Sequence, residues 1–278
     1  MTALGAGLLA SIASGIVGSF VVVKRIAFIA GGISHAILGG MGLCLWAQRT
    51  YGIGWLDPIL GAFAASILSA LLIGWIHLNY RQREDAVIAA IWSTGMAVGV
   101  IFISLTPGTN VELLNYIFGN ILWTNSKDLW MLGALDGLIL VVVGLYYKRF
   151  LSLCFDEEQA LLQGVAVRRL YLLLLSLVAI SVVLLVQMIG TILVIALLTI
   201  PATVASLFTH RLFTMMGLAS LFSVLFSVSG LGSAYFLNWP PGATIALIAA
   251  LVYLAALAFR RKMFSLRKGT LTKPPLFQ

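Results

Sequence analysis

The chain has 278 residues, of which 61% are hydrophobic and only 9% are charged. An ordinary soluble domain carries roughly 25% charged residues, so this composition excludes a water-soluble protein with a polar surface. The formal net charge is +8 at pH 7. We interpret the chain as an all-α, polytopic integral membrane protein.

Nine stretches of the chain are candidate transmembrane helices, because a helix needs about 20 apolar residues to cross the hydrocarbon. Only Gln187 to Gly190 separates the sixth from the seventh. The first has no basic segment before it, so it does not resemble a cleaved signal peptide. We place the nine spans at residues 3–23, 26–47, 58–77, 86–106, 128–147, 169–188, 190–209, 212–236 and 242–259.

The basic residues predict the orientation of these spans. If the N-terminus lies outside, 15 of the 17 lysines and arginines fall on the inner side, and only Arg49 and Lys127 fall outside. The positive-inside rule predicts this asymmetry. We therefore expect an outer N-terminus and a cytoplasmic C-terminus. The positive charge then reflects topology and contact with membrane lipid, not nucleic-acid binding.

The second span carries a histidine in a glycine-rich setting. On a helix, Gly31, His35, Gly39 and Gly42 share one face, with Ser34 at its edge. Small residues allow another helix or a ligand to approach the backbone closely. We expect the imidazole to face the protein, either as a ligand for zinc, manganese or iron or as a hydrogen-bond partner of a neighbouring helix.

Asp136 lies well inside the fifth span, where an ionisable group is a functional candidate. Its carboxylate could face a substrate pathway, lie near a helix dipole or stay hydrated near the interface. His77, His210 and Asp85 lie at the ends of spans, close to water.

Two segments are neither spans nor tight loops. Residues 107–126, on the outer side, contain "VELLNYIFGNILW" and predict an interfacial or re-entrant helix. Residues 150–169, on the inner side, contain "FDEEQALLQG", which predicts a short helix of two or three turns. Asp156 and Glu157 favour its start, where carboxylates stabilise the helix dipole, and Gly164 is a candidate C-terminal cap.

Pro201 interrupts the seventh span in "LLTIPATVASL" and predicts a kink, because proline removes a helical hydrogen bond. Thr199 and Thr203 are available to satisfy the freed backbone. Such a break is common where a helix lines a pathway, although a purely structural kink is equally compatible. We interpret the two cysteines, Cys44 and Cys154, as small apolar packing residues.

Several catalytic motifs are absent from the sequence. It has no G-x-x-x-x-G-K-[ST], which argues against nucleotide hydrolysis by this chain. It has neither H-E-x-x-H nor G-x-S-x-G, so intramembrane hydrolysis has no support. We therefore expect a non-enzymatic membrane protein.

Five blocks together resemble the permease subunits of ATP-binding-cassette importers for transition metals, the ABC-3 group. The likeness covers nearly the whole chain and depends on the order of the blocks. They are "GSFVVVKRIAFIAGGISHAILGGMGL", "EDAVIAAIWSTGMAVGV", "FDEEQALLQGV", "IGTILVIALLTIPATVASL" and "GLGSAYFLNWPPGATIAL".

The resemblance implies a permease in the inner or plasma membrane of a prokaryote. It implies import of zinc, manganese or iron, with ATP bound and hydrolysed on a partner subunit. An extracytoplasmic metal-binding protein and a second permease copy or related chain are the other implied partners. The family pattern often has Asp four residues before the histidine, and here that position is Gly31.

The resemblance also assigns roles along the chain. It makes residues 1–262 one permease domain followed by a cytoplasmic tail at 263–278. It makes the segment at about 150–166, with Asp156, Glu157, Glu158 and Gly164, the coupling helix that contacts the ATPase. The acidic side chains would pair with basic residues of the ATPase.

One alternative belongs to another class, an ion-coupled secondary transporter that uses Asp136 and His35. Inverted repeats and a pair of intramembrane carboxylates would favour it. The sequence has no clear repeat, and only Asp136 lies well inside a span.

Overall fold

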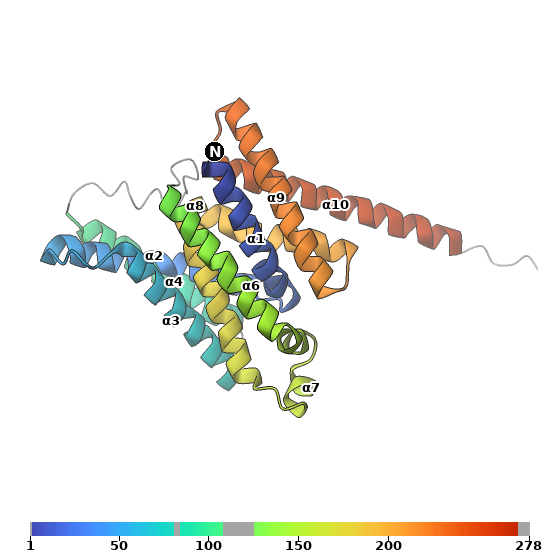
Figure 1. Cartoon of the computed structure of the whole chain (residues 1–278), viewed down its shortest axis with the longest axis horizontal. Coiled ribbons are helices and arrows are strands. Elements are labelled where there is room, and N and C mark those ends of the chain that lie inside the picture. Colours follow the sequence, from blue (N-terminus) through green and yellow to red (C-terminus); the bar gives the residue numbers. More distant parts are fainter. Residues whose placement is uncertain (1, 81–83, 108–124, 272–278) are drawn as a thin grey trace, which may run out of the picture.

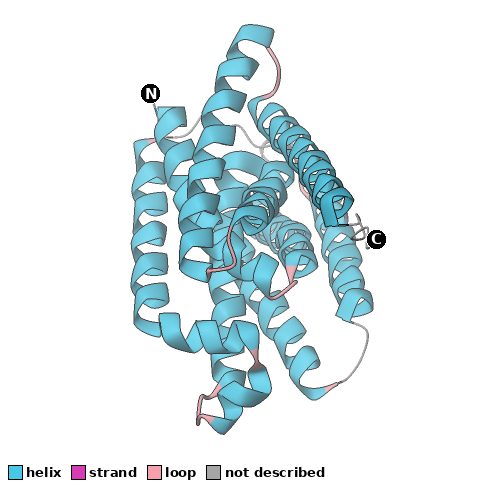
Figure 2. Cartoon of the chain, turned by 90° about the vertical axis from the view of Figure 1, so that its right-hand side faces the viewer, coloured by secondary structure: helices cyan, strands magenta, loops and turns pink. Residues whose placement is uncertain are grey.

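The computed structural model describes residues 2–80, 84–107 and 125–271, and these form helices joined by turns and short connections (Figure 2). The helices are α1 (Thr2–Val23), α2 (Ala27–Tyr51), α3 (Pro58–Asn79), α4 (Glu84–Leu105), α6 (Ser126–Phe155), α7 (Glu157–Leu162), α8 (Val167–Phe208), α9 (Leu212–Leu237) and α10 (Pro241–Leu271). The interfacial helix predicted within 107–126 lies almost entirely outside the described residues.

Nine helical stretches in this part of the chain are long and apolar enough to cross a membrane, as predicted. Two of them, Val167–Gln187 and Ile189–Phe208, lie within α8. Gly190 divides them, with φ 79° and ψ 162°. This positive φ is accessible to glycine because it has no Cβ, so the expected interruption at 187–190 is confirmed.

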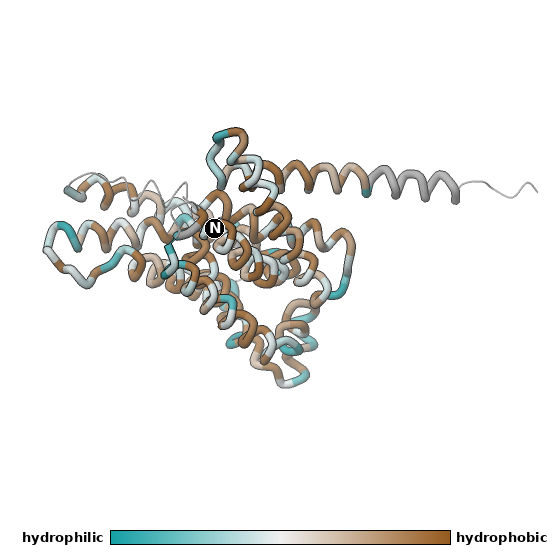
Figure 3. The backbone as a smooth tube through the Cα atoms, turned by 45° about the horizontal axis from the view of Figure 1, so that its top comes forward, coloured by the Kyte–Doolittle hydropathy of each residue, from teal (hydrophilic) through white to brown (hydrophobic). Residues whose placement is uncertain are grey.

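α8 lies at the centre of the bundle, because it contacts α1, α2, α3, α6, α9 and α10. In Figure 1, α2, α3 and α4 lie to the left of α1, α6 and α9, while α10 extends to the right. Hydrophobic residues run along most of the tube in Figure 3, and hydrophilic ones gather towards turns and helix ends. α4 and α10 are mostly exposed along their apolar lengths, as expected of helices that face lipid or another chain.

α6 is longer than the predicted span at 128–147. Lys148 and Arg149 favour helix, and Phe150 and Leu153 beyond them are fully buried, so the helix continues to Phe155. The segment predicted at 150–166 is therefore the end of α6 followed by the separate helix α7. With six residues, α7 is shorter than the two or three turns expected.

The ends of several helices meet near α7. Lys24, just after α1, forms an ion pair with Glu157 of α7. His77, near the end of α3, stacks on Tyr171 in the first turns of α8, with ring centroids 4.7 Å apart. One end of the bundle thus contains the ends of α1, α3 and α6 and the start of α8. This agrees with the predicted order of spans, in which successive helices run in opposite directions across the membrane. Which side of the membrane this end faces stays a prediction.

Two further predictions fall on the later helices. Thr199 and Thr203 donate to the carbonyls of Ile195 and Thr199, at 2.7 and 2.6 Å, not to the Leu197 carbonyl that Pro201 leaves without its helical donor. The non-helical backbone angles of α8 lie at Gly190, and a pathway role for a kink at Pro201 stays a prediction. α10 continues to Leu271, so the division proposed at residue 262 falls within a helix.

Candidate functional site

His35 lies on α2 with its ring against α4. The imidazole stacks on Trp92, with ring centroids 4.4 Å apart and planes 8° from parallel. The side chain is half-buried, and its Nδ1 is buried without a hydrogen-bond partner among the described residues. The flat contact fixes the ring plane and leaves a nitrogen lone pair or N–H available in that plane. A neutral imidazole held in this way is a suitable transient metal ligand.

Gly31 lies one turn before His35, where α2, α4 and α8 converge. A Cβ placed on Gly31 would lie 3.9 Å from Ile195 of α8 and 4.0 Å from Trp92 of α4. Both are ordinary van der Waals distances, so this position accepts a Cβ without a clash. The Ser34 hydroxyl donates to the Gly31 carbonyl at 2.7 Å, within its own helix, and so does not serve as a partner for His35.

Gly39 and Gly42 continue the same face of α2 and pack directly against α4. A Cβ on Gly39 would lie 2.8 Å from the carbonyl oxygen of Gly95, and one on Gly42 would lie 2.9 Å from that of Gly99. Only glycine permits such an approach of two helix backbones. These contacts hold Trp92 over His35, and the lining of a pathway by Gly31 and Gly39 stays a prediction.

Asp136 lies on α6 and is 6% exposed. Both of its carboxylate oxygens are buried without a partner in the described part of the chain, and the group lies beside the backbone of Ala13 in α1. α6 packs against α1, α7 and α8, whereas His35 stacks on Trp92 of α4. The two predicted side chains therefore belong to different helix contacts.

The remaining candidate ligands are scattered. Among the residues that the structure describes, no group of three His, Cys, Asp or Glu side chains could hold a metal ion. His210 is exposed between α8 and α9, and Asp85 is exposed at the start of α4. Cys44 and Cys154 are both free and partly buried. The candidate ligands in the described part of the chain therefore do not form a closed metal site.

The predicted coupling segment forms a capped helix. The Asp156 side chain accepts a hydrogen bond from the Gln159 N–H at 3.0 Å and so caps the start of α7. Gly164, with φ 77°, follows its end, and the N–H groups of Gly164 and Val165 donate to the carbonyls of Leu161 and Ala160. This pattern is a Schellman motif, so the predicted glycine cap is confirmed.

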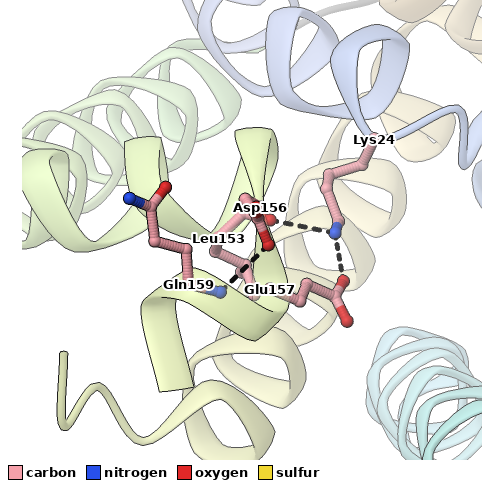
Figure 4. A network of polar contacts seen from close by, with 5 residues as sticks. All are labelled: Lys24, Leu153, Asp156, Glu157 and Gln159. Atoms are coloured by element: carbon pink, nitrogen blue, oxygen red, sulfur yellow. Dashed lines mark hydrogen bonds and ion pairs between the residues drawn. The ribbon is translucent and has the colours of Figure 1, made fainter. Parts of the chain in front are cut away.

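Glu157 and Glu158 of α7 have different surroundings. Glu157 pairs with Lys24, whose ammonium also donates to the Leu153 carbonyl at 3.0 Å (Figure 4). The Lys24 ammonium lies 5.8 Å from the centre of the Tyr171 ring, and its side chain is only 12% exposed. Glu158 is exposed. The ion pair therefore ties α7 to the turn between α1 and α2, the helix that carries His35.

Comparison with known proteins identifies the family. Residues 1–260 match the model of the ABC 3 transport family. The chain belongs to this family.

Relatives of this ABC-3 chain include proteins named for metal transport. A probable metal transport system membrane protein of Chlamydia pneumoniae is 47% identical, over 92% of this chain and 87% of the relative. The manganese transport system membrane protein MntC of Halalkalibacterium halodurans is 31% identical, over 98% of this chain and 89% of the relative. A chain in the solved structure of PsaBC from Streptococcus pneumoniae in complex with Fab matches with a TM-score of 0.80 at 31% identity, over 92% of this chain and 89% of that one.

Three residues of this ABC-3 chain were missed as site residues by the sequence reasoning. Trp92 is one aromatic residue among many apolar ones in its span, and Lys24 is one of 17 basic residues that indicate topology. Tyr171 lies in an apolar run. The sequence did mark two of them, because Trp92 and Lys24 each lie within a segment that resembles the transition-metal permeases. Neither segment indicates which residue of another helix Trp92 or Lys24 contacts.

Proposed function

We propose that this chain forms the translocation pathway of an ATP-driven importer for a divalent transition metal ion, with manganese the first ion to test before zinc and iron. The observation that carries the proposal is the ABC-3 match across residues 1–260. Manganese comes first because two of the relatives are named manganese transport system membrane protein MntC.

The proposal requires partners. A separate ATPase subunit binds and hydrolyses ATP, since this sequence has no P-loop motif. An extracytoplasmic protein delivers the metal, and a second permease copy or a related chain completes the pathway. The exposed apolar length of α4, next to the His35–Trp92 stack, supports a place for that second permease near the candidate ligand.

His35 is the residue we assign to the moving ion. Its ring stacks on Trp92, and Gly31 on the same helix face accepts a Cβ without a clash. The imidazole replaces part of the hydration shell as the ion passes, and the sparse ligand set allows release. Asp136 remains a second candidate for the pathway, at a separate helix contact beside the Ala13 backbone of α1.

α7 is the segment that we assign to coupling. ATP-driven motion of the ATPase displaces α7, and the Lys24–Glu157 ion pair transfers the displacement to the turn between α1 and α2. Glu157 is engaged within the chain, so we assign contact with a basic residue of the ATPase to the exposed Glu158. This division revises the expectation that both glutamates face the ATPase.

Uptake into proteoliposomes tests the function. The chain is reconstituted with its ATPase and binding protein, and manganese, zinc and iron uptake are measured with ATP, without ATP and with a proton or sodium gradient. The proposal predicts uptake that requires ATP. Uptake that follows an ion gradient without ATP contradicts it and favours the secondary-transporter alternative, and loss of that uptake in Asp136→Asn would then place Asp136 in the pathway.

Gly31→Asp tests the completeness of the His35 site. The aspartate lies one turn from the imidazole and adds a second ligand on the same face. We expect tighter metal binding, by about tenfold in Kd, and slower release. Gly31→Asn is the matched control because it fills the same space without the charge, and equal binding by the two variants would contradict a ligand role for this face.

A further inference from the structure

A cavity of about 270 Å³ lies between α6 and α8 at the α7 end of the bundle. Arg149 contributes to it from α6 and Arg169 from α8, while Leu170 and Leu173 form an apolar wall. Residues just after α7, including Ala166, close another side. The cavity therefore combines two cations with an apolar surface.

The two arginines have no acidic partner among the residues that the structure describes. Among the described residues, the ion pair formed is that of Lys24 with Glu157, and neither Arg149 nor Arg169 pairs with a carboxylate. The Arg149 guanidinium lies 5.6 Å from the centre of the Tyr146 ring, which orients it without neutralising its charge. Two uncompensated guanidiniums beside one cavity attract an anion.

The position of the two arginines along their helices indicates which kind of anion the cavity binds. Four residues towards the middle of α6 from Arg149 lies Leu145, which is 77% exposed, and four residues along α8 from Arg169 lies Leu173, which is 36% exposed. Residues four apart share a helix face. On both helices an exposed leucine thus lies one turn from an arginine, at the end of an apolar span, and this spacing fits guanidiniums at the level of the lipid headgroups.

We propose that this cavity binds the phosphate of an anionic phospholipid, with an acyl chain lying along Leu145 and Leu173. Guanidinium groups bind phosphate oxygens through paired, charge-assisted hydrogen bonds. A basic pocket between transmembrane helices is suited to an anionic headgroup. The ligand is a structural lipid that joins α6 to α8 next to the ion pair between Lys24 and α7.

Native mass spectrometry of the purified full-length chain tests the proposal by counting bound lipid during titration with phosphatidylglycerol or phosphatidylcholine. We expect one phosphatidylglycerol to bind in preference to phosphatidylcholine. In Arg149→Gln/Arg169→Gln the affinity should fall on the order of 30-fold, because each arginine near anionic lipid contributes about a fivefold factor.

The matched control is Lys148→Gln/Arg168→Gln, which removes the same charge from exposed neighbours outside the cavity lining. It should retain the lipid. Ala166→Phe provides a second test, since it fills the cavity and leaves both arginines in place, and it should also lose the lipid. Equal loss in the control pair would indicate general surface attraction and overturn the specific site.

Other outcomes also overturn the proposal. Displacement of the lipid by millimolar inorganic phosphate would show a site for free phosphate. Unchanged lipid binding in Arg149→Gln/Arg169→Gln, with loss of ATPase binding, would show a protein-docking site instead. None of these readouts depends on metal uptake, so the lipid site and the proposed transport function are tested separately.

Discussion

The α1–α9 and α2–α4 helix pairs both bring backbones into close contact, but different interactions hold them. Between α1 and α9, Ser11 meets Ser227 with hydroxyl oxygens 3.2 Å apart, and Ser14 meets Ser223 at 3.0 Å. All four serines are buried. Hydrogen bonds are directional, so these two pairs fix the register of α1 on α9.

Between α2 and α4 the central contacts are backbone packing and a ring stack. Gly39 and Gly42 lie against Gly95 and Gly99, and His35 lies flat on Trp92. Such contacts depend on shape rather than on donor–acceptor alignment, so a small displacement of one helix along the other costs less.

The difference assigns separate mechanical roles to the two pairs. We infer that the pair with hydrogen bonds keeps its register, whereas the pair packed on glycines and a ring stack can shift along its length. The candidate metal ligand is on the pair that we infer can shift, and Lys24 joins α7 to the turn that follows α1. This arrangement would let motion at α7 reach His35 through the short turn between α1 and α2.

Gly95→Ala should give the largest loss of stability, because it breaks the packing of α2 on α4. Its Cβ would lie 2.5 Å from the Cα of Ala36, so the helices must separate. We expect a loss of about 1–3 kcal/mol in the free energy of unfolding, measured in detergent. Gly137→Ala is the control, since nothing lies within 4 Å of its Cβ, and it should be neutral or stabilising by up to about 1 kcal/mol. Equal changes in the free energy of unfolding for the two variants would show that Gly95 is not packed more tightly than Gly137.

Glu157→Gln should give the next largest effect, because it leaves the mostly buried Lys24 without its carboxylate. We expect a loss of about 1–2 kcal/mol and more ATP hydrolysed per metal ion imported. Lys24→Glu/Glu157→Lys should recover the coupling ratio, while Glu158→Gln should leave the free energy of unfolding unchanged. If Glu157→Gln hydrolyses the normal amount of ATP per metal ion imported, the ion pair does not take part in coupling.

The smallest effect is expected for the serine contacts of α1 and α9. In a double-mutant cycle of Ser14→Ala and Ser223→Ala, the coupling energy should be about 0.6 kcal/mol, the average for polar contacts between helices in a membrane. The measurement is reversible unfolding of the four proteins in the cycle. A coupling energy of zero would contradict the fixed register of this pair.

Much of the fold could be predicted from the sequence because a membrane span is defined by length and hydrophobicity. The nine spans, the interruption at Gly190 and the cap at Gly164 all follow from local residue types. Rotation of the helices could not be predicted in the same way. Apolar residues surround most of each span, so composition alone does not say which face meets which neighbour.

The site was predictable only in part for the same reason. His35 stands out because an imidazole is unusual in so apolar a span, and the glycines beside it indicate close packing. Other features of the site depend on tertiary contacts between segments that are distant in the sequence. These are the glycine partners on α4, the stacking of Trp92 on the His35 ring and the ion pair of Lys24 with Glu157. The end of α6 was misplaced because burial of Phe150 and Leu153 extends the helix beyond the apolar span.

The most direct test of the central claim is the rate of ATP-dependent manganese uptake by His35→Ala, compared with Ser34→Ala in the same proteoliposomes. The two changes are adjacent on α2, but the Ser34 hydroxyl bonds only within its own helix in the structure. We expect at least a tenfold loss of uptake for His35→Ala, with ATPase assembly intact, and near-normal uptake for Ser34→Ala. Normal uptake of manganese, zinc and iron by His35→Ala would show that His35 does not contact the transported ion.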